Sequence, residues 1–177
     1  MINSRNDAYD LLNKLGAPEH LKTHVRLVGE AVDLLIIKLN ELNLKLDYEL
    51  IQVGVAIHDI GKIKHPNEMS GSGSEHEPTG QKMLLDLGVE SKIARCCLSH
   101  AQFSTMECSL EELVIALSDK LWKGKRVEAL ELRVIDIISE LLGKDRWDIF
   151  SELDEQFEFI ANGGDERLQR SIIIEHA

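Results

Sequence analysis

The sequence predicts a single all-α domain over residues 1–177. No segment shows the strict two-residue alternation of apolar and polar residues that marks a half-buried β-strand. Only three prolines interrupt the chain, and aromatic residues make up 5% of it. Apolar residues recur instead at steps of three and four, which is the spacing of one face of a helix. A length of 177 residues favours one compact domain with a sizeable core.

The first strongly periodic segment predicts a long helix over Glu19–Asn43. Pro18 suits its first turn. The apolar positions of this segment are Leu21, Val25, Val28, Val32, Leu35, Leu39 and Leu42. Tyr48–Ile60 is apolar almost throughout and predicts a buried helix that ends near Gly61, with a buried strand as the competing interpretation.

The rest of the chain predicts further helices joined by short connections. Their ranges are Thr79–Leu87, Ser91–His100, Leu110–Trp122, Arg126–Leu142 and Arg146–Ile160. Asn162-Gly163-Gly164 ends the last of them. Residues 66–74 collect turn formers without periodicity and predict a mobile loop inside the domain.

Charge and composition exclude several classes of function. Twenty Lys and Arg against 31 Asp and Glu give a formal net charge of -11, the wrong sign for bulk binding of nucleic acid or of an anionic membrane surface. A small anionic substrate remains compatible with this charge, because local cations can attract it. The three cysteines form no disulfide framework. With no apolar segment at the N-terminus or of membrane-spanning length, we expect a cytoplasmic protein.

Histidine and aspartate occur where isolated charges are costly. His58-Asp59 follows an apolar helix, and Asp119 lies inside the apolar stretch Leu113–Leu121. A buried carboxylate needs a hydrogen-bonded or cationic partner, and a metal ion is one such partner. The simpler interpretation of His58-Asp59 alone is a hydrogen-bonded histidine at a helix end. Lys120 does not face Asp119 if both lie on one helix, since adjacent helical residues diverge.

A wider set of residues favours a metal site. His24 lies one step off the apolar stripe of the first long helix, and His76 and His100 lie at the ends of predicted elements. The candidate ligands are His24, His58, Asp59, His76, His100 and Asp119. Four imidazoles and two carboxylates exceed the needs of one structural zinc, and this mixed nitrogen and oxygen set suits iron, manganese, cobalt or nickel. Two metals that share one aspartate fit the inventory.

The ordered pattern resembles that of the HD-domain metal-dependent phosphohydrolase superfamily, an H…HD…D motif on a helical fold. Here the motif reads His24, His58-Asp59 and Asp119, and His58-Asp59-Ile60-Gly61-Lys62 is similar to the longer HDxGK form. His76 and His100 match the two extra histidines of the dinuclear branch. The resemblance covers about residues 20–125 and leaves 126–177 as a C-terminal helical extension.

The resemblance implies roles for individual residues. One metal would be held by His24, His58, Asp59 and Asp119, and a second by His76 and His100 with Asp59 as the bridge. The implied cofactor is a pair of divalent ions, Fe or Mn first, with Ni, Co, Zn or Mg as alternatives. A water or hydroxide between the two metals would be the nucleophile, and Lys62 would contact phosphate.

Basic residues near the motif are candidates for substrate binding. Lys120, Lys123, Lys125 and Arg126 form a local cluster in an acidic protein, and Lys123, Lys125 and Arg126 follow the Asp119 segment. They would steer an anionic substrate or form a solvated face. His20 is expected on the surface. The helices after Arg126 either shape the pocket or form the interface of a homo-oligomer, and the sequence does not choose between these roles.

Three functions from different classes fit the motif. The leading hypothesis is a hydrolase that cleaves a phosphate ester or anhydride of a nucleotide or another small phosphorylated metabolite with a metal-bound hydroxide. The second is a diiron oxygenase, because inositol-oxygenase-like members of the superfamily use a similar ligand set. The third is a non-catalytic module that binds a nucleotide or phosphate. Dependence of turnover on O₂ separates the first two.

Overall fold

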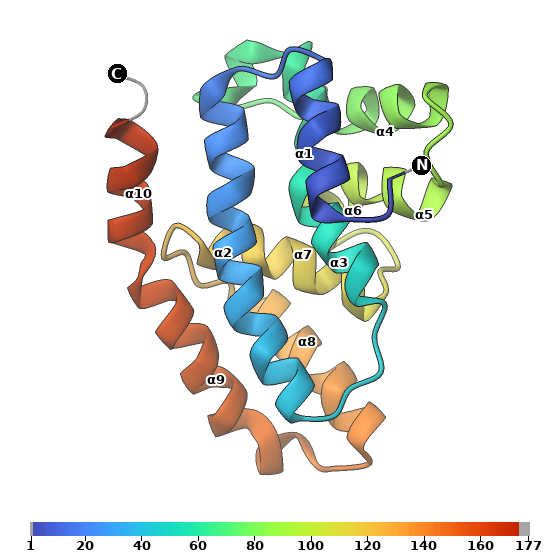
Figure 1. The fold of residues 1–177 in the computed structure, drawn as a ribbon. Coiled ribbons are helices and arrows are strands. Elements are labelled where there is room, and N and C mark those ends of the chain that lie inside the picture. Colours follow the sequence, from blue (N-terminus) through green and yellow to red (C-terminus); the bar gives the residue numbers. More distant parts are fainter. Residues whose placement is uncertain (1, 174–177) are drawn as a thin grey trace.

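The computed structural model describes residues 2–173, which form α- and 3₁₀-helices and contain no strand (Figure 1). The elements, in chain order, are α1 (Arg5–Lys14), α2 (Glu19–Glu41), α3 (Tyr48–Ile57), η1 (Ile60–Ile63), η2 (Pro66–Met69), α4 (His76–Asp86), α5 (Ser91–Ala94), α6 (Cys96–Gln102), α7 (Leu110–Leu121), α8 (Glu128–Leu142), α9 (Arg146–Asn162) and α10 (Gly164–Ile173). The prediction of an all-α fold is confirmed.

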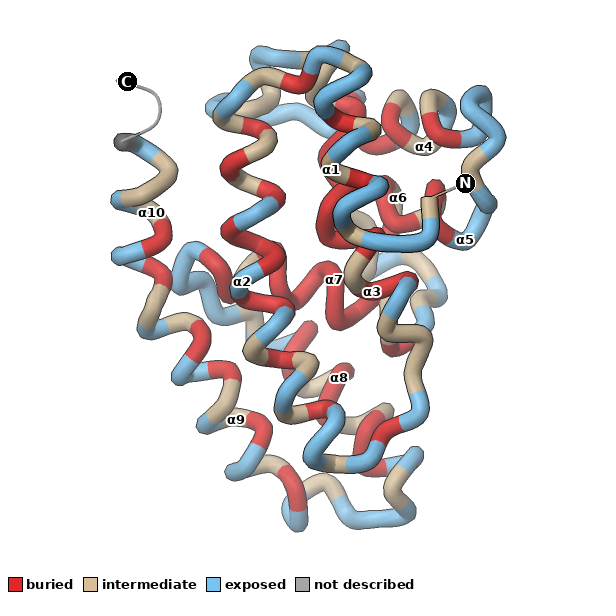
Figure 2. The backbone as a smooth tube through the Cα atoms, viewed as in Figure 1, coloured by how far each residue is buried: buried red, intermediate tan, exposed pale blue. Residues whose placement is uncertain are grey.

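Helices α3 and α7 form the centre of the core. Most residues of both helices are buried, as the red tube segments in Figure 2 show. Helix α3 packs against α1, α2 and α7, while α7 also packs against α6 and α8. Because these two helices are apolar on nearly all sides, each needs neighbours all round. The long helix α2 supplies one of these neighbours, and α9 and α10 lie against it from the other end of the chain (Figure 1).

Side-chain caps explain where several helices begin. Ser109 accepts a hydrogen bond from the backbone N–H of Glu112, and the Glu112 carboxylate accepts one from the N–H of Ser109, which is a capping box. Asp145 makes the same arrangement with Asp148 at the start of α9. Asp47 accepts from the N–H of Leu50 at the start of α3. The caps at Asp47 and Ser109 thus set where α3 and α7 begin, the helices that lead to His58 and Asp119.

The predicted helices agree with the structure except at particular ends. The strand alternative for Tyr48–Ile60 is wrong, and this segment divides into α3 and the start of η1. The predicted helix Ser91–His100 is divided at Arg95 into α5 and α6. Helix α4 begins at His76, three residues before the predicted start, and the predicted loop 66–74 contains η2.

Two helices at the ends of the described chain lack a counterpart among the predictions. Helix α1 begins after Ser4, whose hydroxyl accepts from the N–H of Asp7. This Ser-x-x-Asp pattern is a helix start signal, but the helix offers few buried residues to mark its period. Helix α10 begins at Gly164, within the predicted stop Asn162-Gly163-Gly164. The glycine pair therefore bends the chain between two helices and does not end the helical region.

Hydrogen bonds from Arg167 of α10 join this helix to the C-terminal ends of α7 and α9. Its guanidinium is buried and donates to the carbonyl of Trp122 at 2.7 Å and to that of Leu121 at 3.3 Å, both at the end of α7. It also donates to the carbonyl of Ile160 in α9. A cation at two helix C-termini satisfies carbonyls that lack partners within their own helix. This contact joins α10 to the helix that carries Asp119.

Glycine is required where η1 crosses the start of α4. A Cβ at Gly61 would lie 1.9 Å from the carbonyl oxygen of His76 and 2.7 Å from the backbone nitrogen of Gly80. A Cβ at Gly80 would lie 3.0 Å from the nitrogen of Gly61. The two backbones therefore meet with no room for a side chain. This close approach brings the His76 end of α4 next to Asp59.

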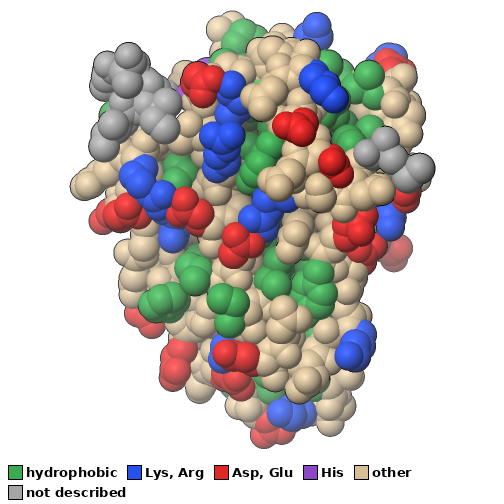
Figure 3. Space-filling view, in the orientation of Figure 1, with side chains coloured by type: hydrophobic (Ala, Val, Ile, Leu, Met, Phe, Trp, Pro, Cys, Tyr) green, Lys and Arg blue, Asp and Glu red, His purple; other side chains and the backbone are tan. Residues whose placement is uncertain are grey.

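Two observations concern the surface and the lengths of the helices. No helix within residues 2–173 is both long enough and apolar enough to cross a membrane. On the face drawn in Figure 3, acidic and basic side chains lie intermixed, with apolar side chains between them.

We predict that Gly61→Ala lowers the free energy of unfolding by about 1–3 kcal/mol, because the added methyl group overpacks backbone atoms that cannot rotate away. Urea denaturation measures this change. Gly29→Ala is the control, since its nearest contacts are the side-chain ends of Tyr9 and Arg5. Equal stability of the Gly61 variant and the wild-type protein would contradict the close approach.

Candidate metal centre

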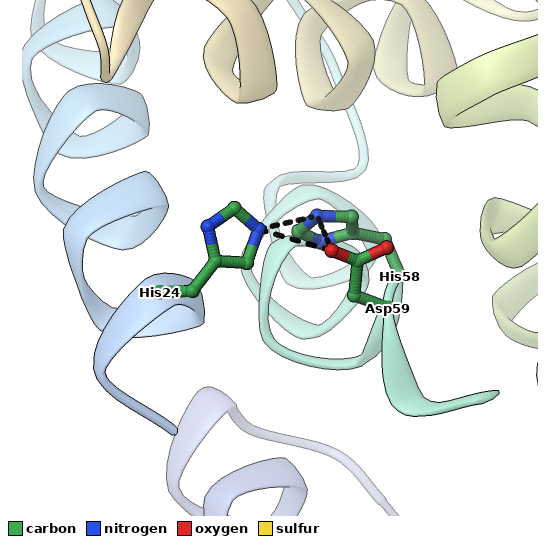
Figure 4. A group of neighbouring side chains, drawn as sticks. All are labelled: His24, His58 and Asp59. Atoms are coloured by element: carbon green, nitrogen blue, oxygen red, sulfur yellow. Dashed lines mark hydrogen bonds and ion pairs between the residues drawn. The ribbon is translucent and has the colours of Figure 1, made fainter. Parts of the chain in front are cut away.

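His24, His58 and Asp59 meet where α2 passes the end of α3. The His24 ring points from α2 toward the two side chains that close α3, as Figure 4 shows. His24 Nε2 lies 3.1 Å from Asp59 Oδ2 and 3.4 Å from His58 Nε2, and His58 Nε2 lies 3.6 Å from the same Asp59 oxygen. The two ring nitrogens therefore face one oxygen of Asp59 and form with it a group of three potential ligand atoms.

His76 and His100 lie on the other side of that carboxylate. His76 Nε2, at the start of α4, is 3.2 Å from Asp59 Oδ1. His100 Nε2, from α6, is 3.4 Å from the same atom. The three side chains form a second group of potential ligands, and all three are buried. Each oxygen of Asp59 therefore faces a different pair of histidines.

Asp119 joins the first group from α7. Its Oδ1 lies 3.5 Å from His24 Nε2 and 3.4 Å from His58 Nε2. Its other oxygen, Oδ2, accepts from Lys120 Nζ at 2.8 Å. The expectation that Lys120 does not face Asp119 is therefore wrong. Adjacent helical side chains diverge at Cβ, but the long lysine stem is flexible enough to turn back to its neighbour.

Hydrogen bonds on the far side of the rings orient the histidines. The Nδ1–H of His58 donates to the carbonyl of Val55 at 2.9 Å, and that of His100 donates to the carbonyl of Cys96 at 3.1 Å. His76 Nδ1 lies 2.5 Å from a carboxylate oxygen of Glu68. Because a carbonyl oxygen only accepts, the proton of His58 and His100 is on Nδ1, and the Nε2 lone pair faces Asp59.

Burial and mutual attraction set the charge state of the two aspartates. Burial alone would raise the pKa of Asp59, but the charge interaction with His58 and the close approach of the other three histidine rings hold this pKa well below its usual range. Asp119 behaves in the same way, with His24, His58 and Lys120 opposing burial and holding its pKa low. Burial lowers the pKa of His58. The site therefore pairs ionised carboxylates with an imidazole that favours its neutral, ligating form.

The same carboxylates also affect the pKa values of His24 and His76. Burial opposes the charge on His24 and His76, but Asp119 and Asp59 outweigh burial at His24 and raise its pKa. At His76, Asp59 and Glu68 raise the pKa against burial. In the protein without metal, the two carboxylates therefore favour the protonated form of these rings.

The buried donor set fits metal binding. Asp59 Oδ1 and His76 Nε2 are buried and make no hydrogen bond with the described residues, although they lie only 3.2 Å apart. Two ligand atoms with no partner of suitable geometry are expected where a cation belongs. Mixed imidazole and carboxylate donors suit iron, manganese and related metals. The residues present therefore fit metal binding, and Asp59 belongs to both groups of potential ligands.

A cavity of about 570 Å³ opens onto these ligands. Lys62, Lys120 and Lys123 line it together with His20 and Ser171 of α10. Lys62 Nζ donates to Asp59 Oδ2 at 2.7 Å, so this ammonium group lies directly at the predicted ligand. His20, expected on the surface, is half-buried, and its side chain borders the cavity outside the ligand set.

Two of the basic residues predicted to bind substrate lie elsewhere. Arg126 pairs with both carboxylate oxygens of Glu131 at 2.8 Å and with Asp154 at 2.5 Å, and it borders a separate cavity between α8 and α9. Lys125 is exposed and does not border the ligand cavity. The turn at Gly124, whose φ is +77°, directs the chain away from the site after Lys123.

Several residues beside the site have no counterpart among the predictions. Glu68 contacts His76, and Glu77 is buried in the cavity wall, where it accepts from Gln102 at 2.7 Å. The Trp122 ring packs edge-on against His24 with ring centroids 5.0 Å apart. The sequence gives one signal for these neighbours, the glutamate that directly follows a candidate ligand histidine in His76-Glu77.

The remaining histidines and cysteines stay outside the ligand set. His65 Nε2 lies 2.9 Å from the hydroxyl of Thr79, and His176 lies outside the described residues. Burial raises the pKa of the Cys96 thiol to about 12 and that of Cys97 well above its usual value. Both thiols are therefore protonated and unreactive. Trp147 is 70% exposed and lines the Arg126 cavity.

Comparison with known proteins agrees with this geometry. The family model described as the HD domain matches residues 21–174. This match extends beyond the 20–125 region of the motifs and includes the helices after Arg126.

Two curated proteins are similar to the chain. An uncharacterized protein of Methanocaldococcus jannaschii is 29% identical over 143 residues, which cover 72% of this chain and 80% of that protein. A tRNA (cytidine(56)-2'-O)-methyltransferase of Thermoplasma volcanium is 25% identical over 151 residues, which cover 77% of this chain but only 41% of that enzyme. No solved structure matches the chain significantly.

The family match spans most of the chain and all six convergent ligand positions. The protein therefore belongs to the HD-domain family.

Proposed function

We propose that this protein is a metal-dependent phosphohydrolase that cleaves a phosphate ester or anhydride of a nucleotide or another small phosphorylated metabolite. The observation that carries this proposal is the position of Asp59, whose two oxygens each face a different pair of histidines. Two bound cations would activate water and neutralise the charge that develops on a phosphoryl group. The family membership supports the same reaction class.

The chain's own residues supply the binding and positioning around the ions. His24, His58, Asp59 and Asp119 would hold one cation, and His76, His100 and Asp59 the other, with Fe or Mn preferred. Lys62 lies at Asp59 and is the residue that we assign to contact phosphate and to act with Asp59 in catalysis. The ammonium groups of Lys120 and Lys123 would attract an anion to the cavity.

The cavity supports a small substrate. Its volume of about 570 Å³ lies in the range of sites for metabolites and cofactors. The net charge of -11 opposes long anionic polymers, so the basic side chains act locally at the cavity. Met69 and Ser70 of the 66–74 segment border the same cavity, so this segment would help to exclude water from a bound substrate.

We predict that Asp59→Ala removes both cations, since this carboxylate serves both groups, whereas His100→Ala removes only one. Elemental analysis of the purified, dialysed proteins measures the content. His20→Ala, which borders the cavity outside the ligand set, should keep both ions and is the control. Two cations retained by the Asp59 variant would contradict the bridging role.

We predict that Lys62→Ala lowers kcat/KM for a phosphate ester by about 100-fold, the usual effect of removing one cationic or hydrogen-bonding group that stabilises developing charge. Hydrolysis of p-nitrophenyl phosphate and of nucleotides, with Mn²⁺ supplied, measures this change. Lys125→Ala removes a nearby lysine that does not border the cavity and should leave the rate unchanged. Equal losses in both variants would indicate only long-range attraction.

We predict that turnover persists without O₂. Rates in aerobic and anaerobic buffer with Mn²⁺ should agree within a factor of two, since hydrolysis involves no electron transfer. Loss of all turnover under anaerobic conditions would instead favour the diiron oxygenase.

A further inference from the structure

Glu68 is the acidic residue of the 3₁₀-helix η2, in the segment that precedes α4. Its side chain is only 11% exposed, although the surrounding loop is largely open to solvent. A carboxylate buried to this degree needs several donors. The structure supplies three, and all of them belong to the first residues of α4 or to the residue before it.

The Glu68 carboxylate contacts the backbone and the side chain of a predicted ligand. Its Oε2 accepts from the backbone N–H of His76 at 3.1 Å and lies 2.5 Å from His76 Nδ1. Its Oε1 accepts from the backbone N–H of Glu75 at 3.2 Å. One side chain from the loop therefore fixes both the position and the ring orientation of His76.

Helix α4 depends on Glu68 at its start. Glu75, the residue in the N-cap position, makes no capping hydrogen bond with its own side chain. The N–H groups at the start of a helix have no partner within the helix, and a carboxylate there is favourable. Glu68 therefore caps α4 from outside the helix, eight residues before His76.

The loop is shaped to admit this carboxylate. A Cβ at Gly73 would lie 2.5 Å from both Cδ and Oε1 of Glu68. The chain thus passes directly over the Glu68 side chain, and a Cβ at residue 73 would displace the carboxylate. The conformation of residues 68–75 and the position of His76 therefore depend on each other.

We propose that Glu68 is a positioning residue that couples the 66–74 loop to the His76 side of the metal centre. This inference rests on the proposed two-cation site. With its Nδ1–H donating to Glu68, the His76 ring presents the Nε2 lone pair to Asp59, and the partner carboxylate strengthens that lone pair as a ligand. Cation binding at His76 and His100 stabilises the loop, and displacement of the loop weakens the same cation.

The test is a titration of metal-free full-length protein with Co²⁺, followed by the visible absorption of the bound ion. Glu68→Gln keeps the shape of the side chain and removes its charge. We expect 10- to 100-fold weaker binding of the second cation with nearly unchanged binding of the first, the usual cost of losing a carboxylate partner of a ligand histidine. Glu75→Gln is the matched control, because it makes the same change one residue before His76 on a side chain that is 80% exposed and lies against His65 instead.

Hydrogen exchange of the peptide over residues 74–80 provides a second measurement. In the wild-type protein, addition of Co²⁺ should slow exchange of the Glu75 and His76 amides, since both donate to Glu68. In Glu68→Gln this slowing should be lost. Retention of the first cation shows that the variant is folded.

The outcomes separate this inference from the proposed function. A wild-type protein that binds fewer than two Co²⁺ ions overturns the two-cation site itself, whatever Glu68 does. A wild-type protein that binds two ions, with the same affinities and the same slowing of exchange in Glu68→Gln, overturns the role of Glu68 alone. Equal weakening of both cations in Glu68→Gln also overturns it, because that result indicates general destabilisation.

Discussion

The rest of the structure depends on the burial of the Asp59 carboxylate among histidines from several helices. This residue is 2% exposed and lies among side chains from α2, α4 and α6 that reach it from opposite sides. A buried anion is costly unless cations or hydrogen bonds surround it. The metal-free protein meets this need with imidazoles and Lys62, and the proposed site would meet it with two cations. The residues that stabilise the buried carboxylate in the metal-free protein are therefore also the residues of the proposed active site.

Contacts outside the ligand set position the elements around that carboxylate. Gly61 and Gly80 allow η1 and α4 to touch, which sets the distance between Asp59 and His76. Arg167 fastens the end of α7, near Asp119, to the C-terminal helices. These contacts lie far apart in the sequence, and each one orients a different ligand. The helices after Arg126 thus contribute to the site by supporting it, and α10 also borders the cavity through Ser171.

Much of the fold and the candidate ligand set follow from sequence patterns, because periodicity and the order of histidines and aspartates are local signals. Helix α2 and the buried segment before Asp59 are of this kind. What could not be predicted depends on three-dimensional neighbours. Arg126 is engaged by Glu131 and Asp154, Lys120 turns back to Asp119, and Glu68 reaches His76 across a loop. Helix α1 has a capping signal but too few buried residues to show a period.

The most direct test of the central claim is anomalous diffraction from crystals of the protein grown with Mn²⁺. The account predicts two anomalous peaks, one on each side of the Asp59 carboxylate, separated by about 3.5–4 Å as in other two-metal sites. One peak would lie against His24, His58 and Asp119, and the other against His76 and His100. A single peak that contacts only one oxygen of Asp59, at saturating Mn²⁺, would contradict the bridging role and with it the proposed mechanism.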